Sequence, residues 1–242
     1  VALNHGIEAS TGEYLARMDS DDICIETRIE KQLLEFHKNK NLALVSSNAF
    51  VINELKQVVS KTKYHKFKDI RGALLKRINP IIHPTVLINR NIVTVPLNYD
   101  PEFNKAEDYE LWLRLSRDYQ FKCMRDALLY LRKHDNNSSN DIANQIRGLA
   151  ALLREYLITI NVNNVNAKEL ILVTEKFYYQ KLMHRQDAIE AIKNVFNKRF
   201  PTQSFYTLSK YGMMRLCTRS LLFKSDINYL IGEVYKLKSN SE

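Results

Sequence analysis

A short apolar stretch that ends in clustered carboxylates is the feature that most constrains this sequence. Residues 12–19, GEYLARMD, have the length and composition of a buried strand, and Asp19, Asp21 and Asp22 lie at its end. Carboxylates at this spacing repel one another, so an ordered turn must supply a cation or backbone N–H donors to them. A D-x-D triplet is common by chance. At the end of a strand, however, it can coordinate a hard divalent cation, which can in turn hold a diphosphate.

Strand and helix patterns alternate through the first part of the chain, and this order predicts an α/β sheet. Asp22 is placed to cap the first expected helix. The expected strands, besides 12–19, cover 42–52, 83–90 and two short stretches within 121–135, and the expected helices cover 23–39, 67–78 and 106–119. The apolar face of the first helix is expected at Ile25, Ile29, Leu33 and Phe36.

After residue 138 the sequence changes to helical patterns with few strand signals. We therefore expect two domains, residues 1–138 and residues 139–242, of which the second is mostly helical. Apolar residues there recur at helical spacing at Ile142, Ile146, Leu149, Leu153 and Leu157.

Positive charge is unevenly distributed along the chain. Residues 140–242 carry 15 Lys+Arg against 9 Asp+Glu, a net charge of +6, whereas residues 1–139 carry 21 against 18, a net of +3. A basic segment, residues 56–77, has eight Lys+Arg and a single acid. Such a segment is most often a solvated surface, and the alternative is attraction to anionic lipid or to a phosphorylated substrate. We expect the C-terminal region to associate peripherally with an anionic membrane, and we expect no nucleic-acid partner, because no recognised binding motif is present.

The sequence has no apolar run of the roughly 18 residues that suggest a membrane span. Its first ten residues lack the charged start and apolar stretch of a signal peptide. Cys24, Cys123 and Cys217 are far apart and are not in metal-binding spacing. These features indicate a reducing compartment. We expect a cytoplasmic protein that associates with the inner face of the plasma membrane.

A second acidic element, Glu107–Asp108, lies at the start of an expected helix. Acids there can simply complement the helix dipole, and the functional alternative is that one carboxylate is a general base. His134 follows an expected strand. A lone histidine is more often a surface residue, but histidine is also a common metal ligand.

Four segments in a fixed order resemble the family 2 glycosyltransferases with a GT-A fold. They are LNHGIEASTGEYLARMDSDDI (3–23), HPTVLINR (83–90), AEDYELWLRL (106–115) and YLRKHDNNSS (130–139). The resemblance implies transfer of a sugar from a nucleotide diphosphate sugar to the hydroxyl of a glycan or glycolipid acceptor. It also implies inversion and a need for Mg²⁺ or Mn²⁺, and the role expected is in surface polysaccharide or lipooligosaccharide biosynthesis.

The resemblance also implies roles for individual residues on the donor side. Asp19–Ser20–Asp21 matches the D-x-D motif, with Asp21 contacting the metal and Asp19 facing the ribose or the metal shell. Arg17 is expected to contact the donor diphosphate. His134 matches a late histidine that approaches the metal or the diphosphate.

On the acceptor side, Asp108 matches the base that takes the proton of the attacking hydroxyl, and Glu107 matches the residue that orients the acceptor. His83 is expected to contact the acceptor. We expect Asp19, Asp21, Asp108 and His134 to converge on one cleft.

One part of the family pattern is absent. Family members carry a preceding half-Rossmann lobe that binds the base and ribose, and three βα units of ~30 residues each would account for it. We therefore expect a truncated GT-A fold, a mixed sheet followed by a helical region, in a fragment of a longer protein. The alternative function is a non-enzymatic basic helical module that docks on membrane or nucleic acid.

Overall fold

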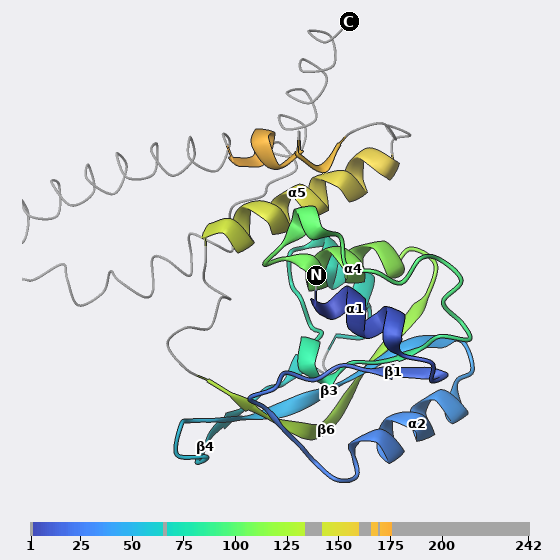
Figure 1. The fold of residues 1–242 in the computed structure, drawn as a ribbon, viewed down its shortest axis with the longest axis vertical. Helices are drawn as coiled ribbons and strands as arrows, with labels where there is room; N and C mark the ends of the chain where they lie inside the picture. The colour runs from blue at the N-terminus through green and yellow to red at the C-terminus, as the bar shows by residue number, and fades with distance from the viewer. Residues whose placement is uncertain (1, 65–66, 134–141, 160–165, 169, 176–242) are drawn as a thin grey trace, which may run out of the picture. The chain divides into compact units, whose positions relative to one another are not determined.

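The strands and helices of this chain are seen in a computed structural model, which describes residues 2–64, 67–133, 142–159, 166–168 and 170–175 (Figure 1). The chain divides into two compact units, Val1–Gly148 and Leu149–Glu242. Each unit is described by itself below. The domain boundary predicted near residue 138 lies outside the described residues and stays a prediction.

The first unit is built on a mixed sheet in which six strands are described. Along the sheet the order is β1-β5-β3-β6-β2, and β4 pairs with β3 off this path. The two long central strands, β3 and β6, run parallel, and the other pairs are antiparallel. The strands are β1 (Tyr14–Ala16), β2 (Ile23–Cys24), β3 (Leu42–Ile52), β4 (Val58–Lys61), β5 (Leu87–Asn89) and β6 (Gln120–Arg132).

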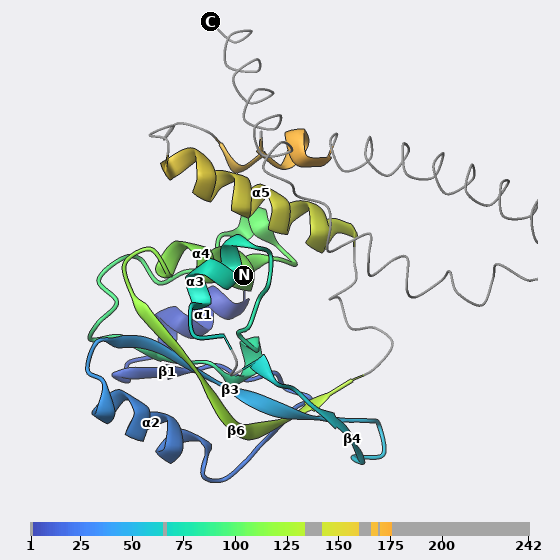
Figure 2. The ribbon, with the colours of Figure 1, turned by 180° about the vertical axis from the view of Figure 1, so that it is seen from behind.

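Helices cover both faces of this sheet. In the two views α2 lies on one face, and α1, α3 and α4 lie on the other (Figures 1 and 2). Because β3 is covered on both faces, its first eight residues are all buried. The helices are α1 (Ala2–Ala9), α2 (Arg28–Lys38), α3 (Ile70–Leu75), α4 (Glu107–Leu115) and α5 (Ile142–Thr159), with 3₁₀ turns η2 (His83–Thr85) and η3 (Pro101–Phe103).

Two sets of apolar side chains form the core of the first unit. Between α2 and the sheet, Phe36 packs with residues of β3, β5 and β6, and its ring lies 5.2 Å from that of Tyr14. On the other face, α4 buries its apolar residues completely. The fully buried side chains there include Leu111, Trp112, Leu113 and Leu115.

The predicted α/β fold with a mixed sheet, in the manner of a GT-A domain, is confirmed. The strand predicted over 42–52 has those bounds, and the helix predicted over 106–119 begins at Glu107 and ends at Leu115. The helix predicted over 67–78 is shorter, because Asp69 caps it and Arg77, with φ 58°, turns the chain after it.

The prediction that Asp22 caps the first helix is wrong. Residues 23–24 form β2 and pair with Leu129 and Tyr130 of β6, so the helix cannot start until Arg28. The residue that precedes it, Thr27, makes no side-chain cap hydrogen bond.

The predicted apolar face of α2 is only partly correct, since Phe36 is buried but Ile29 is exposed. The buried positions of α2 include three polar residues, Arg28, Gln32 and Glu35. Arg28 donates through Nη2 to the carbonyls of Arg17 (2.8 Å) and Val86 (3.1 Å), and through Nε to Gln32 (3.0 Å). This network joins the helix to the backbone around β1 and β5.

Two further strand predictions differ from the structure. Residues 120–132 form one continuous strand, not two, because β6 pairs along nearly the whole of β3. The stretch 83–90 begins as η2, with Pro84 in its first turn, and becomes β5 only at Leu87.

In the second unit, residues 149–159 of α5 and residues 170–175 are helical. Within the described part of the chain, no helix combines the length and apolarity needed to cross a bilayer.

Candidate active site

The acidic turn connects β1, at one edge of the sheet, to β2 at the other edge. Asp22 is buried, and its Oδ1 accepts a hydrogen bond from the backbone N–H of Arg132 at 2.9 Å. Its Oδ2 has no hydrogen-bond partner among the described residues. Burial raises the pKa of Asp22 to about 6, and the neighbouring charges of Asp19 and Asp21 add to this shift. Asp22 therefore secures the turn to the end of β6.

An arginine neutralises the first carboxylate of the triplet. The guanidinium of Arg17 forms two contacts with Asp19, Nη2–Oδ1 at 2.6 Å and Nη1–Oδ2 at 2.8 Å. The backbone N–H of Arg17 donates to the carbonyl of Val86 at 3.0 Å, so the turn is fixed beside η2. Arg17 and Asp19, the two residues predicted to bind the donor, therefore form an ion pair with each other.

The predicted metal ligands are only partly described. Asp21 is exposed, and its backbone carbonyl accepts from Arg132 Nε at 3.0 Å. His134 lies outside the described residues. No group of three or more His, Cys, Asp or Glu side chains suited to a metal is found within the described ranges. The carboxylate oxygens of Asp19 and Asp21 are the donor type that Mg²⁺ and Mn²⁺ prefer, so the residues present fit the expected ion.

His83 lies in an aromatic cluster at the start of η2. Its Nε2 is 2.8 Å from the hydroxyl oxygen of Tyr99, and the edge of Trp112 meets its ring with centroids 5.8 Å apart. Burial lowers the pKa of His83 to about 3, and the charge of Arg17 contributes. His83 is therefore a neutral hydrogen-bonding group at physiological pH.

The second acidic element occupies the first turn of α4, as predicted. Asp108 is half-buried, and its Oδ2 accepts from Asn79 Nδ2 at 3.3 Å. Burial raises the pKa of Asp108 to about 6, and the charge of Glu107 adds to the shift. Glu107 Oε2 is buried without a hydrogen-bond partner among the described residues. A carboxylate with a pKa near neutrality is suited to proton abstraction.

Charges from both acidic elements affect the pKa of one phenol, that of Tyr99. Burial raises the pKa of Tyr99, and the charges of Asp108, Glu107 and Asp19 raise it further, whereas Arg17 opposes them. Residues separated by almost 90 positions in sequence thus lie within electrostatic reach of one side chain. The charges of Arg17, Asp19 and the acids of α4 thus all affect the pKa of Tyr99, and His83 is hydrogen-bonded to its hydroxyl. The expected convergence of Asp19, Asp21, Asp108 and His134 on one cleft stays a prediction.

Two residues of this site escaped the sequence analysis. Tyr99 is held by Asn4 of α1, whose side chain donates to its carbonyl (2.9 Å) and accepts from its N–H (2.8 Å). Asn79 precedes a proline and hydrogen-bonds Asp108. Neither residue belongs to a motif, and the contacts with Asn4 and Asp108 are long-range, so no local signal indicated them.

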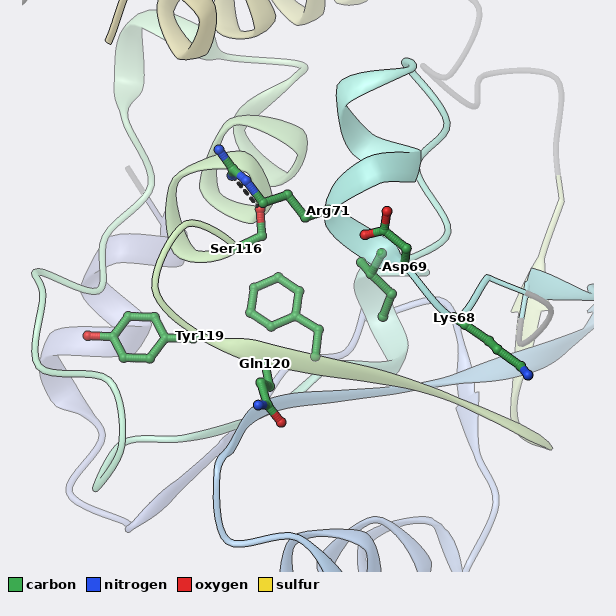
Figure 3. Close-up of a pocket in the computed structure, with 8 residues that line it drawn as sticks. Lys68, Asp69, Arg71, Ser116, Tyr119 and Gln120 are labelled. Atoms are coloured by element: carbon green, nitrogen blue, oxygen red, sulfur yellow. Dashed lines mark hydrogen bonds between the residues drawn. The ribbon is translucent and has the colours of Figure 1, made fainter. Parts of the chain in front are cut away.

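A surface depression lies apart from these residues (Figure 3). It has a volume of about 270 Å³ and contains none of the predicted site residues. Arg71, at its rim, donates to Ser116 Oγ at 3.1 Å and to the carbonyl of Leu113 at 3.2 Å. The depression is lined by Lys68, Asp69, Ile70, Arg71, Ser116, Tyr119, Gln120 and Phe121.

Comparison with known proteins finds a family match over the first part of the chain. Residues 1–94 match the sequence profile described as glycosyl transferase family 2. The first 94 residues therefore belong to glycosyl transferase family 2. The matched family 2 region contains Arg17, Asp19, Asp21 and His83, and it ends before the acids of α4.

Relatives of the family 2 region extend the likeness further along the chain. An uncharacterized glycosyltransferase of Methanocaldococcus jannaschii is 30% identical over 132 residues, which cover 53% of this chain and 45% of the relative. The O-antigen biosynthesis glycosyltransferase WbnJ of Escherichia coli is 28% identical over 166 residues, which cover 67% of this chain and 64% of the relative. The amylovoran biosynthesis glycosyltransferase AmsE of Erwinia amylovora is 30% identical over 154 residues, which cover 61% of this chain and 53% of the relative. Matched residues of this chain thus span about half to two thirds of these relatives.

Proposed function

We propose that this chain carries the catalytic part of a glycosyltransferase that moves a sugar from a nucleotide diphosphate sugar to the hydroxyl of a glycan or glycolipid acceptor. The observation that carries the proposal is that the charges of Asp19, Arg17, Glu107 and Asp108 all affect the pKa of Tyr99, whose hydroxyl is hydrogen-bonded to His83. Relatives named for O-antigen and amylovoran biosynthesis support a role in surface polysaccharide or lipooligosaccharide assembly. We place this activity in the cytoplasm, at the inner face of the plasma membrane.

In the proposed reaction Asp108 is the general base. The acceptor hydroxyl oxygen attacks the anomeric carbon, the bond from that carbon to the diphosphate oxygen breaks, and the hydroxyl proton passes to the Asp108 carboxylate. A single displacement of this kind inverts the anomeric centre. The raised pKa of Asp108, about 6, leaves it ionised at neutral pH yet more basic than an ordinary aspartate. Glu107 orients the acceptor, and the neutral His83 provides a hydrogen bond to it.

On the donor side, Asp21 and Asp19, with His134, would hold Mg²⁺ or Mn²⁺. When bound, such an ion neutralises the charge that develops on the leaving diphosphate. Arg17 is placed to do the same through its guanidinium, because its pairing with Asp19 keeps a cation beside the triplet.

The proposal is tested by ligand-dependent stabilisation of the chain against thermal unfolding. Uridine, guanosine and thymidine diphosphates are added separately, with and without Mn²⁺. We expect one of them to raise the melting temperature only when Mn²⁺ is present, because a ligand at about 100 times its Kd stabilises by roughly 2.7 kcal/mol. A protein stabilised by oligonucleotides instead, in a salt-sensitive manner, would support the alternative basic module.

A further inference from the structure

The turn between β3 and β4 displays apolar side chains to solvent. Leu55 is 77% exposed, Val58 54% and Val59 58%, and all four residues of β4 are exposed. In both views the β4 end of the sheet projects past the other strands (Figures 1 and 2). Single exposed apolar residues are ordinary on a protein surface, but three within five positions form a patch that needs a partner.

This exposure does not result from a loose loop, because the turn is closely hydrogen-bonded. Asn53 N–H donates to the Gln57 carbonyl at 3.1 Å, and Gln57 N–H donates to Asn53 Oδ1 at 2.9 Å. Their side-chain amides are joined at 3.0 Å. Lys56 takes a left-handed conformation, φ 60°, and its N–H donates to the Asn53 carbonyl at 3.0 Å. The turn therefore holds Leu55 at its tip.

Lysines surround the apolar patch. Lys56, Lys61 and Lys63 are exposed, and Glu54 is the single acid between residues 53 and 64. The ammonium of Lys61 lies 5.4 Å from the centre of the Phe50 ring. Apolar side chains ringed by lysines match the two layers of an anionic lipid surface, acyl chains below and phosphates above.

We propose that the β3–β4 hairpin (residues 50–63) is a membrane-docking element. Leu55, Val58 and Val59 enter the headgroup region of an anionic bilayer, and the three lysines contact lipid phosphates. An apolar partner protein or a second copy of the chain would match the valines and leucine, but it would leave the lysines without complementary charge. This surface is distinct from the charge of residues 140–242, and its assignment does not depend on the proposed transfer reaction.

Arg132 links the hairpin to the acidic turn. Its Nη1 donates to the carbonyls of Asn53 and Glu54, both at 3.4 Å, and its Nε donates to the carbonyl of Asp21 at 3.0 Å. Docking through the hairpin would therefore set the position of the D-x-D turn relative to the lipid surface. If the proposed function is correct, this position suits an acceptor whose hydroxyl stands at the headgroup level.

Vesicle sedimentation of the full chain tests the proposal, without donor or acceptor. Vesicles of phosphatidylcholine alone are compared with vesicles containing about one third phosphatidylserine. We expect binding to the anionic vesicles, and we expect Leu55→Ser/Val58→Ser/Val59→Ser to weaken it about tenfold or more. Lys56→Gln, Lys61→Gln and Lys63→Gln should each weaken it about fivefold, the ratio for ~1 kcal/mol per basic residue.

Matched variants on α2 and after it separate the hairpin from the general charge of the chain. Leu34→Ser, at a residue 47% exposed, removes one exposed apolar side chain elsewhere, and Lys31→Gln/Lys38→Gln/Lys40→Gln removes three positive charges elsewhere, more than any single hairpin lysine variant. These control variants should bind the anionic vesicles with an affinity within about twofold of that of the unchanged chain. All the substituted hairpin positions are exposed, and circular dichroism would check that each variant is folded.

Three results would overturn the proposal. The first is hairpin variants that bind as well as the α2 variants, which would assign any lipid binding to other parts of the chain. The second is equal binding to neutral and anionic vesicles, or no binding at all. The third is a concentration-dependent dimer, seen by ultracentrifugation, that the triple serine variant abolishes, because the patch would then be an interface between copies. None of these results bears on nucleotide binding, so the proposed function stands or fails separately.

Discussion

His83 and Tyr99 share a hydrogen bond of 2.8 Å between Nε2 and the phenol oxygen, and both are neutral at physiological pH. Burial and Arg17 hold the pKa of His83 at about 3, and burial together with the neighbouring carboxylates raises that of Tyr99. The site therefore has two hydrogen-bonding groups that do not titrate near neutrality. Its pH response must come from the carboxyl groups whose pKa values are raised.

The pH dependence of transfer should accordingly follow Asp108. Its pKa of about 6 means that the carboxylate becomes protonated as the pH falls through 6, and a protonated base cannot accept the hydroxyl proton. We expect kcat/KM for sugar transfer to fall about tenfold per pH unit below this value. His83→Gln should lower activity but keep the same acidic limb. A limb that disappears in His83→Gln would assign the titration to the histidine instead.

Asp22 should make stability depend on pH in an unusual direction. Its pKa is raised from 3.8 to about 6, so the folded state binds more protons than the unfolded state between these values. This contribution to stability is fully present below the unfolded pKa and is lost as the pH rises through 6. Urea unfolding in the presence of EDTA should therefore show a component of the unfolding free energy that falls between pH 4 and pH 6.5. More than about one pH unit outside this range, the contribution of Asp22 should no longer change with pH.

Asp22→Asn identifies that component. The amide keeps the oxygen that accepts from Arg132 N–H, but it also buries an amino group where Oδ2 lacks a partner in the described structure. Removing the buried charge stabilises, and the unpaired amino group costs about 1–3 kcal/mol, so the net change at neutral pH is small. The result that identifies Asp22 is a smaller slope of the unfolding free energy against pH in the variant. Asp108 shifts in the same direction, so about half of the slope should remain, and an unchanged slope would contradict the assignment.

The buried polar face of α2 gives a stability prediction. Replacing Arg28 by methionine keeps most of the apolar stem but removes the donors to the carbonyls of Arg17 and Val86 and to Gln32. The carbonyl of Val86 keeps its hydrogen bond from Arg17 N–H, but the carbonyl of Arg17 and Oε1 of Gln32 lose the donor that Arg28 supplies. A buried acceptor without a donor costs about 1–3 kcal/mol, so Arg28→Met should lower the unfolding free energy by roughly 3 kcal/mol. Lys31→Met, on the same helix but at a half-exposed side chain, should change the unfolding free energy by about 0.5 kcal/mol. Similar losses in both variants would show that the network contributes little.

The Arg28 network also shows why parts of the fold were predicted and others were not. β3 and α4 were predicted because their signals are local: β3 is rich in apolar and β-branched residues, and in α4 acids are followed by apolar residues at helical spacing. The start of α2 depends on a different kind of information. The pairing of residues 23–24 with β6, about 105 positions later, keeps the chain extended where the local pattern favours helix. A polar face that is buried by long-range hydrogen bonds leaves no apolar periodicity to detect.

The candidate site divides in the same way. Asp19, Asp21, Glu107 and Asp108 were selected because acids beside a strand end and a helix start carry recognisable chemistry. Tyr99 was missed because its role depends on Asn4, almost 100 positions earlier, and on the meeting of the two acidic elements. The convergence itself is a property of the sheet order, which places the turn after β1 beside η2.

The final prediction compares the roles of Asp108 and Asp21 in the proposed transfer reaction. Asp108→Asn should leave Mn²⁺-dependent binding of the nucleoside diphosphate nearly intact while it lowers turnover by about 10²–10⁴-fold, or ~3–5 kcal/mol of barrier, because only the base is removed. Asp21→Asn should instead weaken that binding, because one charged oxygen ligand of a hard cation is lost. The exposed Asp21 and the half-buried Asp108 both stay acceptors as asparagine, so neither variant should lose its fold.

Calorimetry of nucleoside diphosphate binding with Mn²⁺, together with measured turnover, separates the two carboxylates. Glu102→Gln is a suitable control, because it changes the same charge in η3, just before α4 and outside the predicted site. The reasoning requires Asp108 to serve the acceptor hydroxyl and Asp21 the diphosphate side. Equal loss of donor binding in both variants, or full turnover in Asp108→Asn, would show that these roles are wrong. Because Arg17 opposes the raised pKa of Asp108, a small change of donor affinity in Asp108→Asn is compatible with the assignment, and a tenfold change is not.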